Sequence, residues 1–429
     1  MRVAIVADTF PPLRTSGAVQ IRDLAREFVA QGHEATVIVP SDGLDLPWKV
    51  ENVGGATVLR CRTPGTKDIG YVRRTINEMR LPYLLLRAFR ASELSRACWD
   101  GVVWYAPSIF LGPIVRVLRR ENRCRSYLIL RDIFPEWAVD MGLMRRGLTY
   151  WFFKLVERYQ YSVADTIGVQ TMANLPYLSE WARQPGRKLE VLQNWLSDAQ
   201  DTGCRIRIEE SKLTGRKIFV YAGNMGVAQG IDIFIDLAAR MRTHKDVGFL
   251  FVGRGRDAAK LIVAAEEQNL DNLVYHDEIE PAEIPGLLAQ CHVGIVALDP
   301  RHKTHNIPGK FLTYMQAGLP VLARTNPGND LERLINDERV GCACGGGDAE
   351  ALQRLADELI SNPAELKAMR GRCQMLSKRV FSSAIAVKQI VAALSPDAET
   401  TDRRESFSFC EERPRHESSG SHRHARRRR

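Results

Sequence analysis

The first forty residues, MRVAIVADTFPPLRTSGAVQIRDLAREFVAQGHEATVIVP (1–40), decide the fold class. Residues 2–7 and 35–39 are short apolar runs typical of buried strands. Between them, up to Gly32, apolar residues recur at helical spacing, namely Ile21, Leu24, Ala25 and Phe28. Strand, helix and strand in this order predict a βαβ unit, whose two strands lie parallel in one sheet.

The same pattern continues along the chain and then starts again. Further strands are expected at 56–61, 101–105, 126–130 and 165–169. A second series, with helices between its members, is expected at 217–221, 247–252, 273–275, 293–297 and 319–323. We therefore predict an α/β protein of two doubly wound, Rossmann-like domains that face each other across a cleft.

Changes in composition set the domain boundaries. Residues 1–198 form the first predicted domain and 216–380 the second, with a polar, aperiodic linker at 199–215. A closing helix is expected at 381–395, for which packing back on the first domain is one option. Residues 396–429 are polar and Arg-rich, which predicts a disordered basic tail.

The composition excludes several classes of protein. The 429 residues are 45% hydrophobic and 26% charged, values typical of a globular protein rather than a fibrous or wholly disordered one. No apolar run reaches the roughly 18 residues of a membrane span, and the N-terminus lacks the pattern of a signal peptide. Nine scattered cysteines without a C-x-x-C pair predict neither a disulfide framework nor a zinc site. We expect a cytoplasmic protein with reduced thiols.

Four of the nine net positive charges lie in the last 28 residues. Residues 402–429 hold nine arginines against five acidic residues. A solvated appendage is the simpler interpretation of this segment, and contact with nucleic acid or acidic lipid is the alternative. Nucleic acid is not expected as a partner of the folded domains.

Two glycine-bearing loops follow strands of the second predicted domain. Ligands of open α/β sheets bind at such carboxyl ends, where glycine lets the backbone approach a phosphate closely. Gly223-Asn-Met-Gly226 opens towards a helix in this way. Residues 253–258, GRGRDA, match the loose dinucleotide pattern but do not open the first βαβ unit, so a nicotinamide site is a weak alternative.

The stretch HNIPGKFLTYMQAGLP (305–320) predicts a helix with Pro308 in its first turn and Gly318 at its end. Lys310 and Thr313 share one face of that helix. A cation at a helix N-terminus opposes the helix dipole, so Lys310 either faces a bound anion or lies exposed on a solvated helix. Both interpretations stay open.

The chain contains no Asp-x-Asp, so the sequence does not support a carboxylate-held metal ion for a nucleotide diphosphate. We expect neither a metal nor a cofactor. A diphosphate bound here would be neutralised by backbone N–H groups and cationic side chains.

Over residues 1–395 the chain resembles the GT-B glycosyltransferases, specifically family 4, and within it the bacterial L-fucosamine transferases of surface-polysaccharide synthesis. The landmarks, in order, are Asp8-Thr-Phe-Pro-Pro12 with Ser16-Gly17, Arg131-Asp-Ile-Phe-Pro-Glu136, Asn194-Trp195, and the segments 221–226, 251–255 and 306–320. Each motif is unspecific by itself. Their order and spacing together carry the resemblance.

The resemblance implies a retaining, metal-independent hexosyl- or amino-sugar transferase. Its UDP- or GDP-sugar donor would be held by the second domain, and a glycan or polyprenyl-diphosphate-sugar acceptor by the first. The product would belong to a surface polysaccharide such as O-antigen or capsule. The donor-binding residues carried over are Gly17, Gly223, Asn224, Gly226, Gln229, Arg254, His305, Asn306, Lys310 and Thr313.

Several positions depart from the family pattern. His305 and Thr313 stand where the family often has two glutamates, one for the sugar and one for the ribose. Asn224 and Gln229 replace a basic pair, and Arg131-Asp132 replaces a His-Asp pair. These changes transfer phosphate neutralisation to Lys310 and Arg254, and they leave open a catalytically inactive relative.

Asp132 is the best catalytic acid of the first domain because it follows the apolar strand 127–130 and so lies at a carboxyl end. A general base or transition-state partner is one role for it, and a loop-capping aspartate is the other. Glu136 is the second candidate.

Two stretches, 71–96 and 145–161, combine arginines with aromatic and aliphatic residues. Such stretches lie on anionic membrane surfaces, which would bring the protein to the inner face of the cytoplasmic membrane. Helices that pack inward with their arginines outward are the alternative.

Two other functions fit the same architecture. A nucleotide-sugar 2-epimerase would need carboxylates and histidines converging on the sugar ring, and the cleft offers few. A non-catalytic two-domain sugar-binding protein would not need loops that cradle phosphate.

Overall fold

The computed structural model describes residues 1–395, except 14, 67–68, 198–200, 227–228 and 301–305. Met1–Leu394 form one compact unit. The predicted tail, 396–429, lies outside the described residues. No helix among the described residues is long and apolar enough to cross a bilayer.

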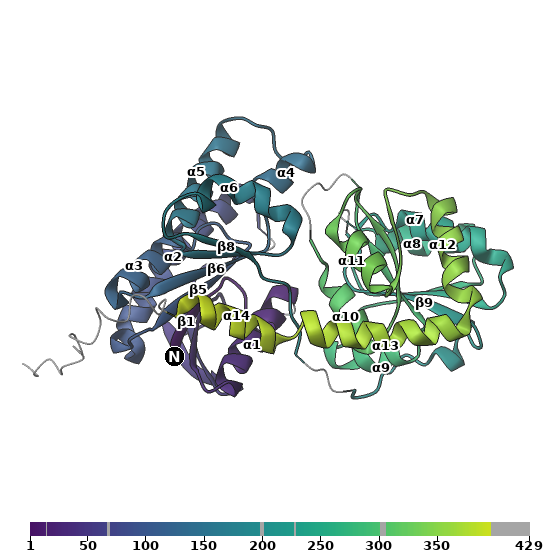
Figure 1. Cartoon of the computed structure of the whole chain (residues 1–429), viewed down its shortest axis with the longest axis horizontal. Coiled ribbons are helices and arrows are strands. Elements are labelled where there is room, and N and C mark those ends of the chain that lie inside the picture. Colours follow the sequence, from purple (N-terminus) through teal and green to yellow (C-terminus); the bar gives the residue numbers. More distant parts are fainter. Residues whose placement is uncertain (14, 67–68, 198–200, 227–228, 301–305, 396–429) are drawn as a thin grey trace, which may run out of the picture. The chain divides into compact units, whose positions relative to one another are not determined.

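The first domain is built on an eight-stranded sheet in the order β3-β4-β2-β1-β5-β6-β7-β8 (Figure 1). All neighbouring strands are parallel except β3 and β4, which form an antiparallel pair at one edge. The strands are β1 (Arg2–Val6), β2 (Glu34–Ser41), β3 (Trp48–Val53), β4 (Ala56–Arg62), β5 (Gly101–Ala106), β6 (Arg125–Leu130), β7 (Thr166–Val169) and β8 (Lys188–Val191).

Helices cover both faces of this sheet because side chains alternate across a strand. In β1, Ala4 and Val6 join the core beneath α2, α3 and α5, whereas Val3 and Ile5 join the core beneath α1. The helices of this domain are α1 (Ser16–Ala30), α2 (Tyr71–Ala91), α3 (Gly112–Asn122), α4 (Glu136–Asp140), α5 (Leu148–Val163) and α6 (Ser179–Ala182).

The second domain repeats this plan with an all-parallel sheet in the order β11-β10-β9-β12-β13-β14. Its strands are β9 (Lys217–Ala222), β10 (Val247–Val252), β11 (Leu273–His276), β12 (Val293–Ala297), β13 (Val321–Thr325) and β14 (Gly341–Gly345). Its helices are α7 (Asp232–Arg240), α8 (Ala258–Glu267), α9 (Ile284–Ala289), α10 (Gly309–Ala317), α11 (Asp330–Glu338), α12 (Ala349–Ser361) and α13 (Pro363–Val380). The prediction of two doubly wound α/β domains is thus confirmed.

The last helix, α14 (Ser383–Leu394), packs against the first domain beside α1 (Figure 1). Ala386, Val387 and Ile390 are buried in the core that contains β1 and α1. The amide of Gln31, at the end of α1, donates to the Ala384 carbonyl over 3.1 Å. The chain therefore crosses back to its first sheet after completing its second.

Three strands were missed by the sequence analysis, namely β3, β8 and β14. β3 has no fully buried residue, and β14 contains Gly341 and Gly345, so neither has the apolar run that predicts a strand. A smaller correction concerns Pro308, which was placed in the first turn of its helix. It is instead the residue before α10, with extended backbone angles, and the helix begins at Gly309.

Candidate functional site

The first turn of α10 places a lysine beside the loop that follows β9. The Nζ atom of Lys310 lies 3.4 Å from the centre of the Tyr221 ring. It has no exposed surface and, among the described residues, no hydrogen-bond partner. A Cβ atom added to Gly223 would lie 3.7 Å from Lys310 Cε. The amine is therefore enclosed by the aromatic end of β9 and the glycine that follows it.

This environment is unfavourable for a charge. Desolvation holds the pKa of Lys310 well below its usual value. The Tyr221 ring offers a cation–π contact but no hydrogen-bond acceptor. Exposure on a solvated helix, one of the two interpretations of Lys310, is therefore wrong for the amine. The position suits an anion that would approach it past Gly223.

The glycines of the two strand-end loops serve a purpose that the sequence analysis missed. The Gly223 N–H donates to the Val252 carbonyl over 2.9 Å, and the Met225 N–H to the Arg254 carbonyl over 2.8 Å. A Cβ atom at Gly253 would collide with the Gly223 carbonyl oxygen. The glycine at 253 is therefore needed because the two loops pack backbone to backbone, which accounts for the GRG sequence without a dinucleotide.

Two side-chain contacts close the described part of the 223–229 loop. Asn224 is exposed, and its carbonyl accepts the Tyr221 hydroxyl over 2.6 Å. The Gln229 side chain accepts the Gly226 N–H over 2.9 Å. Gln229 thus fastens the loop through its amide oxygen.

The other predicted donor residues are engaged in contacts of their own or lie near the start of α10. Arg254 is exposed and pairs with Glu278 over 3.1 Å, so its charge is already partnered. The Thr313 hydroxyl donates to the Gly309 carbonyl of its own helix over 3.2 Å. Asn306 is half-buried just before α10, and His305 lies outside the described residues.

The start of α1 meets the start of α10. A Cβ atom at Gly309 would lie 2.9 Å from the Ser16 hydroxyl. At Gly17, a Cβ atom would lie 3.0 Å from the Tyr105 ring, so a side chain there would press against β5. Two helix N-termini, each with free N–H groups and a positive dipole end, therefore approach each other.

Two side-chain amides fix the segment that leads into α10. Gln170 and Asn194, both buried, donate to the Ile307 carbonyl over 2.7 and 2.9 Å. Asn194 belongs to one of the sequence landmarks, and this bond gives it a positioning role. No signal in the sequence indicated Gln170.

A pocket of about 850 Å³ opens in the first domain, at the carboxyl ends of β1, β5 and β6. Asp132 is exposed and lines it, together with Asp8, which follows β1 as Asp132 follows β6. Much of the remaining lining is apolar, including Tyr71, Val72, Ile109, Phe110, Phe134, Trp137, Leu143, Met144, Leu148 and Phe153. A position after a parallel strand was the signal that could have identified Asp8.

Arg131, the neighbour of Asp132, has a structural role. Its guanidinium is buried, donates to the Leu192 carbonyl over 2.7 Å and lies 4.9 Å from the centre of the Trp195 ring. Burial lowers its pKa to about 10. Arg131 thus anchors the strand end from which Asp132 reaches the pocket.

Glu136 does not line this pocket. Its carboxylate accepts Lys154 over 2.6 Å and the Tyr150 hydroxyl over 3.2 Å. Lys154 also bonds Glu157, whose pKa is raised to about 7 by burial. Glu136 is therefore part of an ion-pair network between α4 and α5. Among the described residues, no cluster of three or more metal-ligating side chains occurs.

Comparison with known proteins gives matches across both domains. Residues 16–195 match the family described as "Glycosyl transferase 4-like domain", and residues 216–362 match "Glycosyl transferases group 1". WbjE of Pseudomonas aeruginosa, named as a glycosyltransferase, is 26% identical over 287 residues, which cover 65% of this chain and 70% of that protein.

Two further similarities extend the comparison. WcaI of Escherichia coli strain K12, named as a glycosyl transferase of colanic acid biosynthesis, is 24% identical over 326 residues, covering 68% of this chain and 76% of that protein. A UDP-forming alpha,alpha-trehalose-phosphate synthase from Burkholderia xenovorans superposes with a TM-score of 0.70 at 15% identity, covering 92% of this chain and 100% of that one. This structural likeness concerns the fold.

Proposed function

We propose that this chain, which belongs to glycosyltransferase family 4, moves a sugar with retention from a UDP- or GDP-sugar to a glycan or polyprenyl-diphosphate-linked acceptor. The observation that carries the proposal is the enclosed Lys310 amine, which lies beside Gly223 and finds no hydrogen-bond partner in the part of the chain that the structure describes. A buried cation without a partner is costly, and a bound diphosphate would remove that cost.

The donor diphosphate would bind between Lys310 and the N-termini of α1 and α10. The absence of a side chain at Gly223 lets a phosphate approach Lys310, and helix N-termini favour anions. As the bond between the sugar C1 and the diphosphate breaks, negative charge grows on the leaving oxygen. A fixed cation and fixed N–H groups stabilise that charge without reorganising, which lowers the barrier.

The acceptor would bind in the 850 Å³ pocket, with its reacting hydroxyl near Asp132. That hydroxyl oxygen forms the new bond to C1, and its proton passes to Asp132 or to the departing diphosphate. The aromatic and aliphatic lining suits an acceptor with an apolar part, such as a polyprenyl carrier. Of the two catalytic candidates, Asp132 would thus contact the reacting hydroxyl, whereas Glu136 would belong to the ion-pair network that supports the site.

The biological setting is proposed from the relatives. WcaI is named for colanic acid biosynthesis, a surface polysaccharide, and a role in O-antigen or capsule synthesis is of the same kind. An L-fucosamine donor, a metal-independent reaction and a place at the inner face of the cytoplasmic membrane belong to this proposal.

The test is a screen of UDP- and GDP-sugars by thermal stabilisation, followed by transfer or slow hydrolysis of the donor that binds. We expect stabilisation by UDP or GDP and release of that nucleotide on turnover. Conversion of the nucleotide sugar without release of nucleotide would favour an epimerase. Stabilisation by free sugars and by no nucleotide would contradict the proposal and favour a sugar-binding protein.

A further inference from the structure

One face of α2 exposes large apolar side chains to solvent. Val72, Ile76, Met79 and Tyr83 are between 44% and 76% exposed. Their spacing of four, three and four residues places them on one side of the helix. The opposite side packs on the sheet through buried Leu81, Leu85 and Phe89. We call the four exposed residues the α2 stripe.

A row of cations runs beside the α2 stripe. Arg73, Arg80 and Arg87 recur every seven residues, so they lie on one side of the helix next to the stripe. All three are exposed, and among the described residues none has an ion-pair partner. The whole of α2 holds five arginines and one glutamate. An amphipathic helix with this division of apolar and cationic residues is suited to a membrane surface.

The start of α5 also exposes large apolar side chains to solvent. Leu148, Trp151 and Leu155 are each more than half exposed and share one face of the helix. Leu148 also lines the large pocket, as do Tyr71 and Val72 of α2. The apolar surface of both helices is therefore continuous with the pocket proposed for the acceptor.

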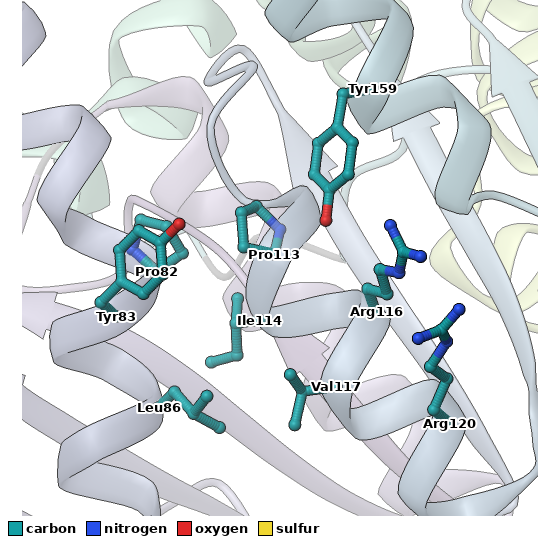
Figure 2. A pocket seen from close by; sticks show the side chains of 9 residues that line it. All are labelled: Pro82, Tyr83, Leu86, Pro113, Ile114, Arg116, Val117, Arg120 and Tyr159. Atoms are coloured by element: carbon teal, nitrogen blue, oxygen red, sulfur yellow. The ribbon is translucent and has the colours of Figure 1, made fainter.

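A second, smaller pocket lies at the other end of the α2 stripe. It measures about 340 Å³ and is formed by α2, α3 and Tyr159 of α5 (Figure 2). Tyr83 belongs to both the stripe and this groove. The floor is apolar, with Pro82, Leu86, Pro113, Ile114 and Val117.

Two arginines of α3 occupy one side of this groove. Figure 2 shows Arg116 and Arg120 side by side, across from the residues of α2. The groove lining contains no acidic residue, and among the described residues neither arginine has a carboxylate partner. Arg116 lies 5.8 Å from the centre of the Tyr159 ring, a contact that steadies the guanidinium without neutralising it. Paired guanidinium groups are the preferred partners of a phosphate.

We propose that this groove binds the phosphate headgroup of an anionic phospholipid, while the α2 stripe and the exposed face of α5 lie in the surface of the bilayer. The apolar floor would hold the glycerol and the first acyl carbons, and Arg116 with Arg120 would hold the phosphate. Nucleic acid would need the cations but not the exposed apolar stripe. Free phosphate would need neither the stripe nor the apolar floor.

A membrane bound at this surface would lie at the entrance of the proposed acceptor pocket. A lipid-linked sugar could enter the large pocket from the bilayer past Leu148, Tyr71 and Val72, without leaving the lipid phase entirely. That consequence rests on the proposed transferase function. The headgroup site itself rests on α2, α3 and α5 alone.

The experiment measures binding of the full chain to vesicles of phosphatidylcholine and to vesicles of an equal mixture of phosphatidylcholine and phosphatidylglycerol. The wild type should bind the mixed vesicles and hardly the neutral ones. The double variant Arg116→Gln/Arg120→Gln should bind the mixed vesicles about thirtyfold more weakly, since each arginine near an anionic surface contributes about 1 kcal/mol. A second variant, Ile76→Gln/Met79→Gln, should weaken binding without changing charge.

The matched control is Arg242→Gln/Lys367→Gln, which removes the same charge from exposed positions of the second domain. It should leave vesicle binding unchanged within about twofold, because these positions lie outside the proposed surface. Equal loss in this control would overturn the headgroup site, and so would equal binding of neutral vesicles. Stabilisation by inorganic phosphate that needs both arginines, without vesicle binding, would replace the lipid by a free anion.

Nucleotide binding separates this proposal from the previous one. Arg116→Gln/Arg120→Gln should keep any thermal stabilisation by UDP or GDP, which also shows that the variant is folded. Vesicle binding that depends on these arginines would stand even if no nucleotide stabilised the protein, and the donor site alone would then fail.

Discussion

The two domains share one topology, yet the carboxyl ends of their sheets are built differently. In the second domain, the loops after β9 and β10 pack on each other, backbone to backbone, through Gly223 and Gly253. They leave a confined position for one amine, that of Lys310. In the first domain, the loops after β5 and β6 carry aromatic residues and surround a pocket of about 850 Å³.

This difference fits the proposed transfer reaction, in which one domain binds the donor and the other the acceptor. A diphosphate needs few contacts of high charge density, and glycine loops with helix N-termini supply them. An acceptor with an apolar part needs area and shape, which aromatic side chains supply. The residue types of these loops, glycine in one domain and aromatic residues in the other, therefore fit the substrate proposed for each domain.

The sharpest test of this division is Lys310→Met, which keeps an unbranched side chain of nearly the same length and removes its charge. Turnover should fall by about a hundredfold, the usual scale for losing one transition-state charge contact. Binding of UDP or GDP should weaken as well. The unliganded protein should melt at the same temperature or slightly higher, because the substitution removes a buried amine that has no partner. Steady-state kinetics and thermal melts measure both effects.

Lys367→Met, at an exposed position of α13, is the matched control and should change neither quantity. A Lys310→Met enzyme with wild-type turnover would show that the diphosphate is bound elsewhere. A large drop in melting temperature would instead give Lys310 a structural role.

The first domain is tested by a pair of carboxamide variants at its two carboxylates. Asp132→Asn should lower turnover about fiftyfold, somewhat below the usual effect of a general base because the leaving diphosphate can share the proton. Its donor binding and stability should be unchanged, since Asp132 is exposed in the pocket. Glu136→Gln should keep most activity but cost about 1–3 kcal/mol of stability, because it removes the charge that pairs with Lys154. The reverse result would exchange the two roles.

The alternation and spacing of apolar residues predicted the fold to a large extent. The buried strands β1, β2, β5 and β6 are continuous apolar runs, as parallel strands covered on both faces must be. Edge strands such as β3 lack this signal because one side of them faces water. The path of α14 depends on which surface is left uncovered, and a local pattern does not contain that information.

The candidate site was predictable only where a residue type conflicts with its local position. Lys310 was recognisable as a cation on the first turn of a helix, whereas its stacking on Tyr221 depends on β9, about ninety residues earlier. The Gly253 pattern suggested a nucleotide, but the contact that requires it is the Gly223 carbonyl of a neighbouring loop. Such contacts between distant segments are not visible in the order of residues.

A smaller effect is expected from pH, again only in the second domain. Burial holds the pKa of Lys310 low in the empty site, and a diphosphate beside the amine would raise it. Donor binding should therefore take up a proton and should weaken by up to about tenfold per pH unit between the two pKa values. Calorimetry in buffers of different ionisation enthalpy measures the uptake. It should disappear in Lys310→Met, and uptake that persists there would assign the proton to another group.

Removal of divalent metal should have the smallest effect, because we expect turnover not to change. Neither region gathers three metal-ligating side chains among the described residues, and the sequence has no Asp-x-Asp. If Lys310 and two helix N-termini neutralise the diphosphate, EDTA should leave turnover unchanged within about twofold, because no charge in the leaving-group site is lost. Activity lost to EDTA and restored by magnesium or manganese would mean that a metal completes this site. The two domains would then still differ in the residues of their strand-end loops, but Lys310 would no longer be the group that neutralises the diphosphate.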